Sequence, residues 1–142
     1  MPMKKIFVGS LVFVLSFYAG FGAAQSKKAA ALMIQKDLLE AKTRTETRPV
    51  LDRNMFSQNK YAYEAYGIAK EMPGVLDKLF CYCYCEVNPR FKHKSLLTCY
   101  TDAHASQCGV CMREAFVAKK MAMEGKSHEE IAMYLRDFYL KN

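Results

Sequence analysis

The sequence predicts a small all-α protein with an irregular cysteine-rich segment, preceded by a cleaved signal peptide. Two observations favour this fold class. Apolar residues recur three or four positions apart through most of the chain, which is the spacing of amphipathic helices. No stretch alternates convincingly between apolar and polar residues, as a half-buried strand would, and no internal repeat of useful period is present. At 142 residues the chain has room for one domain.

The N-terminal segment has the form of a secretory signal peptide. Lys4 and Lys5 precede an uncharged run over residues 6–24, which closes on small residues before Gln25. We expect cleavage after Ala24 and export to the periplasm or the extracytoplasmic face of the cell envelope. The alternative is an uncleaved membrane anchor, because the run is just long enough to span a bilayer, although glycines and serines dilute it. In either case the cysteines lie outside the cytoplasm, where disulfides are permitted.

Residues 25–71 are predicted to form an N-terminal region that is partly helical and partly extended. Residues 26–42 have the apolar spacing of an amphipathic helix, whereas residues 43–54 have neither a helical nor a strand period and are expected to be an extended connector. Residues 58–71 resume a helical pattern. Its apolar stripe is widened by tyrosines, which we expect to pack in the core: Tyr61, Tyr63 and Tyr66.

Residues 72–142 are predicted to form a Cys/His-rich helical domain. After a turn at Asn88-Pro89, one helix is expected to begin at an N-cap provided by Asp102 or Ser106 and to end before Gly125. Ser127 and the glutamate three residues later form a capping box that opens the last helix. The two helices therefore form a hairpin at the C-terminal end.

All six cysteines fall within residues 81–111, and the first three alternate with tyrosines in Cys81-Tyr82-Cys83-Tyr84-Cys85. In an extended backbone, alternate side chains point to opposite faces, so the three thiols would share one face. Same-face residues two apart lie roughly 6.5 to 7 Å apart at Cα, which is the outer limit for a disulfide. We therefore expect these cysteines to find other partners, whether thiols, a metal or a substrate.

The second sulfur motif is Cys108-Gly109-Val110-Cys111, and its role depends on where the helix begins. If Ser106 is the N-cap, Cys108 lies in the first turn, where the helix dipole favours a thiolate. If Asp102 is the cap, His104 and Cys108 share a face as a ligand pair. Cys111 can close a disulfide with Cys108, join it on a metal, or resolve a mixed disulfide. The sequence leaves these alternatives open.

A soft metal ion is the ligand that this donor set suits best. Thiolates supplemented by imidazoles favour Cu(I) or zinc. Covalent haem is not expected, because Met112 stands where c-type attachment requires a histidine. His128 is expected at the surface, and for the other two histidines exposure without a ligand role is about as well supported as coordination. The predicted ligands are Cys81, Cys83, Cys85, Cys108 and Cys111, with Cys99, His93 and His104 in second rank.

The charge of the chain gives little support to a nucleic-acid partner. The net charge is +7, but the basic residues are scattered and form no run. Contact with a membrane is expected only if the N-terminal segment is not cleaved. The expected partners are therefore a metal ion or a thiol/disulfide partner protein.

Taken together, these motifs resemble the small exported bacterial proteins named for a PCYCGC or CYCXC motif, some of which carry selenocysteine at the last motif position. The resemblance covers roughly residues 72–140 and rests on the motif at 81–85, the segment from His93 to Cys99, and His104 with the later CxxC pair. Phe80 and Tyr84 replace the Pro and Gly of the PCYCGC form, so the chain is nearer the CYCXC branch. The resemblance implies a reactive or metal-binding chalcogen at Cys85 but no defined biochemical function.

Three functions remain open, in narrow order of preference. The first is binding of a soft metal through clustered thiols. The second is thiol–disulfide exchange, in which Cys85 or Cys108 attacks and another cysteine resolves; whether the protein is an enzyme is therefore undecided. The third is a disulfide-stapled interaction module, which has the highest general prior for exported cysteine-rich chains. It is weakened by the absence of cysteines from residues 25–80, since a framework bracing the whole chain would spread them.

Overall fold

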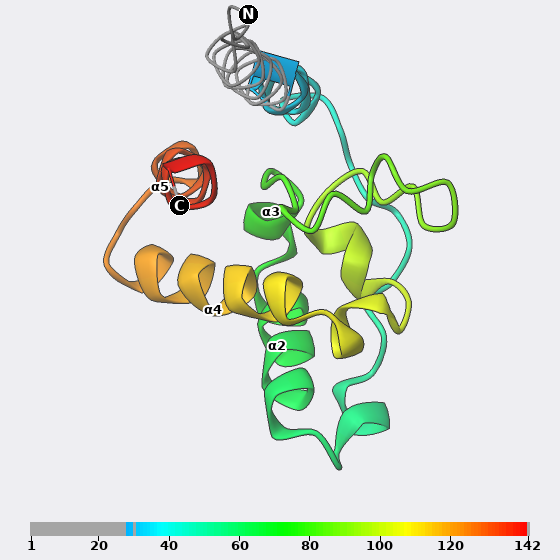
Figure 1. The fold of residues 1–142 in the computed structure, drawn as a ribbon. Helices are drawn as coiled ribbons and strands as arrows, with labels where there is room; N and C mark the ends of the chain where they lie inside the picture. Colours follow the sequence, from blue (N-terminus) through cyan, green and yellow to red (C-terminus); the bar gives the residue numbers. More distant parts are fainter. Residues whose placement is uncertain (1–27, 30, 142) are drawn as a thin grey trace, which may run out of the picture. The chain divides into compact units, whose positions relative to one another are not determined.

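The computed structural model describes residues 28–29 and 31–141, so the predicted signal peptide lies outside the described residues. The chain divides into two compact units, Met1–Met33 and Ile34–Asn142, and the second contains every cysteine and histidine. Throughout the described part of the chain the regular elements are helices and none is a strand, which confirms the all-α prediction (Figure 1). Among these same residues, none of the helices combines the length and the apolar character that crossing a membrane requires.

The elements of the second unit follow one another with short connections, except for the cysteine-bearing segment and for an extended connector before the first 3-10 helix. A helical segment ends at residue 40 and is followed by an extended connector, as predicted. The remaining elements are the 3-10 helix η1 (Arg53–Phe56), α2 (Lys60–Glu71), α3 (Pro73–Leu76), the 3-10 helices η2 (Leu97–Tyr100) and η3 (His104–Gln107), α4 (Gly109–Met123) and α5 (His128–Lys141). Residues 77–96, which carry the first three cysteines, contain turns but no helix.

Local side-chain chemistry sets several helix ends. The Asn59 side chain accepts a hydrogen bond from the N–H of Ala62 and caps α2. Gly125 has a φ of +81°, the left-handed conformation that ends α4 without strain on a side chain. The predicted capping box of α5 is confirmed: Ser127 N–H donates to Glu130 Oε2 at 2.9 Å, and Glu130 N–H donates to Ser127 Oγ at 3.3 Å.

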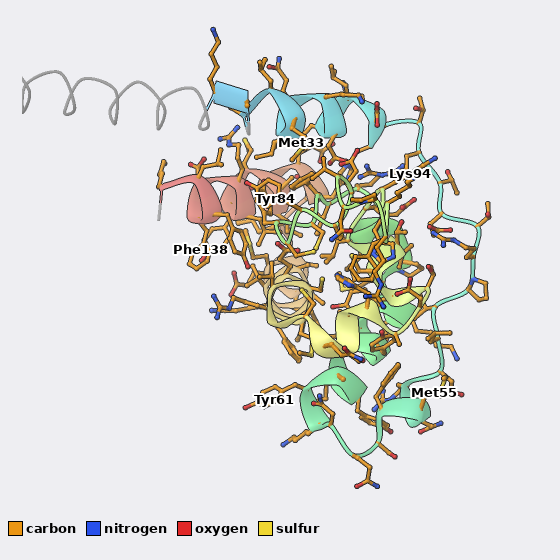
Figure 2. All side chains as sticks on the ribbon, turned by 45° about the vertical axis from the view of Figure 1, so that its right-hand side comes forward. Met33, Met55, Tyr61, Tyr84, Lys94 and Phe138 are labelled. Atoms are coloured by element: carbon orange, nitrogen blue, oxygen red, sulfur yellow. The ribbon has the colours of Figure 1, made fainter. Side chains whose placement is uncertain are left out.

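The core of this unit is formed where α2 packs against α4, and α5 also packs against α4. Small side chains allow α2 and α4 to approach closely; these are Ala62, Ala65, Ala69, Ala115 and Ala118, all fully buried. Tyr66 is buried as predicted, but the prediction for Tyr61 was wrong, because its side chain is 69% exposed and projects outward (Figure 2). Tyr61 lies in the first turn of α2, at one edge of the buried face.

The extended connector is tied to both ends of the cysteine-bearing loop. The Arg44 guanidinium forms an ion pair with buried Asp37 and donates to the carbonyl of Asp77 at 2.9 Å. Glu46 accepts a hydrogen bond from Thr98 Oγ1, also at 2.9 Å. Across the base of the loop, Ser95 Oγ donates to Asp77 Oδ1. These bonds fix the positions at which the chain enters and leaves the cysteine segment.

Candidate metal centre

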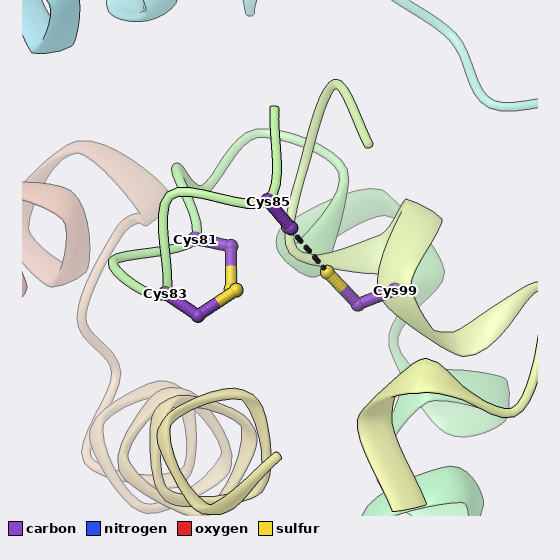
Figure 3. A group of neighbouring side chains, drawn as sticks. All are labelled: Cys81, Cys83, Cys85 and Cys99. Atoms are coloured by element: carbon purple, nitrogen blue, oxygen red, sulfur yellow. Dashed lines mark hydrogen bonds between the residues drawn. The ribbon is translucent and has the colours of Figure 1, made fainter. Parts of the chain in front are cut away.

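Residues Cys81–Cys85 form a turn, so the extended segment predicted from their alternation was wrong. The N–H of Tyr84 donates to the carbonyl of Cys81 at 3.1 Å, and Tyr84 adopts a φ of 58°. No strand in the described residues offers a ladder to this segment, and the N–H of Tyr82 donates instead to a side chain, that of Glu114. The turn brings the sulfurs of Cys81 and Cys83 to 3.3 Å, with the two side chains facing each other (Figure 3).

Cys111 joins these two thiols from the first turn of α4. Its sulfur lies 3.4 Å from that of Cys81 and 3.8 Å from that of Cys83. The three sulfurs therefore form a compact triangle, which we call the sulfur triangle. His104 approaches the same triangle, with its Nε2 3.5 Å from the sulfur of Cys83. Cys81 and Cys111 are buried, and Cys83 is half-buried.

A second pair of thiols adjoins the sulfur triangle. Cys85, at the end of the turn, lies 3.3 Å from Cys99 of η2, measured between sulfurs (Figure 3). Cys99 is fully buried, and its thiol donates to the carbonyl of Ser95 at 3.7 Å. Ring nitrogens of His93 and His104 lie within 4.8 Å of both sulfurs and of each other. This second set thus combines two thiols with two imidazoles.

Asp102 holds both histidines in place. Its Oδ2 lies 2.9 Å from His93 Nε2, and its Oδ1 accepts the backbone N–H of His104 at 2.8 Å. His93 is only 2% exposed, and its Nδ1 is buried without a hydrogen-bond partner. A neutral histidine that donates through Nε2 carries its lone pair on Nδ1, so the carboxylate leaves that nitrogen available as a ligand.

Cys108 lies at the edge of the site and itself occupies the N-cap position of α4. The predicted caps were therefore wrong: η3 intervenes between Asp102 and α4, and Ser106 Oγ donates to the carbonyl of Ala103 instead of capping the helix. His104 and Cys108 consequently do not share the face of one α-helix. Cys108 is half-buried and lines a cavity of about 450 Å³ together with Arg90 and His104.

The pKa values of the thiols differ in direction across the site. The pKa of Cys83 is lowered, because the thiols of Cys108, Cys111 and Cys81 can donate hydrogen bonds to its thiolate. For the five other cysteines the pKa is raised. Neighbouring thiols, together with burial, raise the pKa of Cys81, Cys85, Cys99 and Cys111. At Cys108 a hydrogen bond with Cys111 lowers the pKa, but a hydrogen bond with Cys83 and burial outweigh it. Negative charge is therefore accommodated at Cys83, and the remaining thiols resist ionisation while no cation is bound.

Glu114 is a buried acidic neighbour that the sequence analysis missed. It is fully buried on α4, and its Oε1 accepts the backbone N–H of Tyr82 at 2.9 Å, whereas its Oε2 has no hydrogen-bond partner. Burial raises the pKa of this carboxyl well above its ordinary value. The ring of Tyr82 stacks on Tyr139 of α5, with centroids 4.8 Å apart and planes 10° apart. The position of Glu114, three residues after Cys111 on one helix face, was the available signal.

Seven of the eight predicted ligand candidates fall into three overlapping groups of potential metal ligands, and Cys108 is the one outside them. Cys99 belongs to all three groups. All six cysteines are free thiols, and the sulfur–sulfur distances given above exceed the disulfide bond length of about 2.05 Å. His128 is exposed and pairs with Glu129. Clustered cysteines and histidines in this protein could therefore hold a metal ion.

Comparison with known proteins gives one match. A family model described as a protein of unknown function with PCYCGC motif matches residues 10–142. No curated protein and no solved structure matches the chain significantly.

Proposed function

The chain belongs to the PCYCGC family of proteins of unknown function. For this member of the family we propose that it binds a soft metal ion, Cu(I) or zinc, through clustered thiolates. The observation that carries this proposal is the sulfur triangle. Its edges of 3.3, 3.4 and 3.8 Å are close to the separation of about 3.8 Å between sulfurs that share a tetrahedral zinc ion with bonds of about 2.3 Å. His104 Nε2, 3.5 Å from Cys83, is close to the corresponding sulfur–nitrogen distance of about 3.6 Å.

The protonation of the site supports the same function. Cys83, with its lowered pKa, offers a thiolate to an arriving cation. The bound cation then favours the anionic form of neighbouring thiols whose pKa values are otherwise raised. Binding therefore releases protons, and the affinity falls as the pH is lowered.

Localisation is part of the proposal. The uncharged run over residues 6–24 and the small residues before Gln25 support export to the periplasm or the outer face of the membrane, after cleavage following Ala24. Intact-mass measurement of protein recovered from the cell envelope tests this step. Retention of Met1 on a membrane-embedded species would contradict cleavage.

The binding function is tested by metal uptake. Reduced protein is titrated with zinc or Cu(I) against a chelator of known affinity, and bound metal is measured by elemental analysis. Substitution of Cys83→Ser together with Cys85→Ser is expected to abolish most uptake. His128→Ala is the matched control and is expected to bind metal as the wild type does. His128 is exposed, lies outside the cysteine-bearing part of the sequence and pairs with Glu129. Equal affinity of the wild type and the double variant would refute the metal function.

Thiol–disulfide exchange is the second candidate, and the 3.3 Å approach of Cys85 to Cys99 favours it. In this reaction the Cys85 thiol loses its proton, and its sulfur attacks a disulfide of a partner protein and expels one partner thiolate. Cys99 then attacks the mixed disulfide, so the partner leaves as a dithiol and the Cys85–Cys99 pair becomes oxidised. The half-buried Cys108 is the alternative attacking thiol. Failure of metal binding, with retention of exchange activity, would favour this candidate over the first.

A further inference from the structure

We propose that the site holds two metal ions bridged by the Cys99 thiolate, an inference that rests on the proposed metal-binding function. The starting observation is the number of donors. Five thiols and two imidazoles lie in overlapping groups, within each of which every ligand atom is within 4.8 Å of the others. One tetrahedral ion uses four donors. A single ion would therefore leave three donors of this buried cluster without a metal.

The first ion would occupy the sulfur triangle together with Cys99. The triangle is formed by Cys81, Cys83 and Cys111. Cys99 lies within 4.8 Å of the first two sulfurs in one group and of Cys111 in another. These four sulfurs come from the turn, from η2 and from the first turn of α4, and they form the Cys₄ ligand set typical of a closed zinc site.

The second ion would share Cys99 with the first. Its donors are Cys85, Cys99, His93 and His104, which form one of the groups. His104 also lies 3.5 Å from Cys83, but four sulfurs already complete the first ion, so His104 is assigned to the second. The 3.3 Å separation of the two sulfurs and the unpartnered Nδ1 of His93 both suit coordination. Because Nε2 of His93 is engaged by Asp102, Nδ1 is the nitrogen left for an ion.

Sharing Cys99 makes the donor count complete. Seven donors with one bridging sulfur supply eight coordination positions, the number that two tetrahedral ions require. Cys99 is the cysteine common to all three groups, and it is fully buried. Cys108 is outside the groups and lines the adjoining cavity, so it is left out of both sets.

The charge of the buried site agrees with two ions. Five thiolates around one divalent ion would leave a net charge of −3 in a site whose members are mostly buried, whereas two divalent ions reduce it to −1. Unneutralised charge in a buried site costs free energy, so a second divalent ion lowers the cost of burying five coordinating sulfurs. Two ions allow all five to coordinate.

The test is the zinc stoichiometry of the reduced full chain, measured by native mass spectrometry and by elemental analysis. Two equivalents are expected for the wild type. Cys85→Ser removes a donor that belongs to the second set alone and is expected to leave one equivalent. His128→Ala is the matched control and is expected to retain two, because His128 is exposed and belongs to none of the donor groups. Circular dichroism of each protein establishes that it is folded.

The outcomes separate this inference from the proposed function. One equivalent in the folded wild type would overturn the two-ion site and leave metal binding intact. No zinc and no Cu(I) in the wild type would overturn both. Two equivalents in folded Cys85→Ser would also overturn the assignment of the second set. If Cys85→Ser does not fold, the wild-type stoichiometry and the variant His93→Gln, which should likewise retain one equivalent, decide the question.

Discussion

Removal of the Asp102 carboxylate should weaken metal binding more than it weakens the fold. Asp102→Ala deletes two hydrogen bonds, from His93 Nε2 at 2.9 Å and from the N–H of His104 at 2.8 Å. A neutral hydrogen bond contributes about 1 kcal/mol, and a buried group left unpaired costs about 1 to 3 kcal/mol. The Asp102 side chain is 47% exposed, so water can partly replace it, and we expect a loss of about 1 to 2 kcal/mol in the free energy of unfolding.

The effect on the metal should be larger, because Asp102 orients a ligand. Loss of a group that supports a metal-bound histidine typically lowers affinity about 10- to 100-fold, which corresponds to about 1.4 to 2.7 kcal/mol. Competition with a chelator measures the zinc affinity, and urea unfolding of the metal-free protein measures stability. Asp102→Asn keeps one acceptor oxygen and should give an intermediate affinity.

Asp52→Ala is the matched control for this experiment. Asp52 accepts the N–H of Asn54 and caps η1, so its loss should cost about 0.5 to 2 kcal/mol of stability. Zinc affinity should not change, since η1 contributes none of the candidate ligands. Equal zinc affinities of Asp102→Ala and wild type, or an equal loss in both variants, would refute the role assigned to Asp102.

Two further predictions concern the buried groups beside the site. The pKa of Glu114 is raised, so the folded protein keeps a proton on this carboxyl at a pH where the unfolded chain, with its ordinary pKa of about 4.5, has released it. The free energy of unfolding should therefore fall as the pH rises, by at most about 1.4 kcal/mol per pH unit. Glu114→Gln should remove this decline in urea unfolding of the metal-free protein between pH 5 and 7; parallel curves for variant and wild type would contradict the assignment. In single-cysteine variants, Cys108 should be alkylated faster than Cys99, because Cys108 is half-buried and Cys99 is fully buried; mass spectrometry follows the rates, and equal rates would contradict the position of Cys108 at the edge of the site.

The helices were predictable because their signals are local. The capping box at Ser127 and Glu130 needs only residues within one turn, and the structure contains both of its hydrogen bonds. The same holds for Gly125, whose φ of +81° suits the end of a helix. The residue at which α4 begins could not be predicted from neighbouring residues alone. Asp102 is instead used by His93 and His104, which removes it from the competition for a helix start.

The geometry of the cysteines could not be read from their spacing. Alternation over five residues is compatible with a strand, but here the backbone of Cys81–Cys85 closes on itself. The central place of Cys99 depends on η2 being held by Ser95 and Asp77, a tertiary arrangement without a sequence period. Glu114 was overlooked because a glutamate in a helix is usually exposed. Its position three residues after Cys111, on the same helix face, was the sequence signal that it lies beside the buried thiols.

The stacking of Tyr82 on Tyr139 has a spectroscopic consequence. The chain has nine tyrosines and no tryptophan, so its near-ultraviolet circular dichroism should arise chiefly from phenol rings held in fixed, asymmetric surroundings. Tyr82 lies between two cysteines of the turn, and its ring is fixed against the C-terminal helix. Any movement of the turn therefore changes the coupling between two chromophores whose planes are only 10° apart. The protein carries an intrinsic optical reporter of its thiol site, which requires no added label.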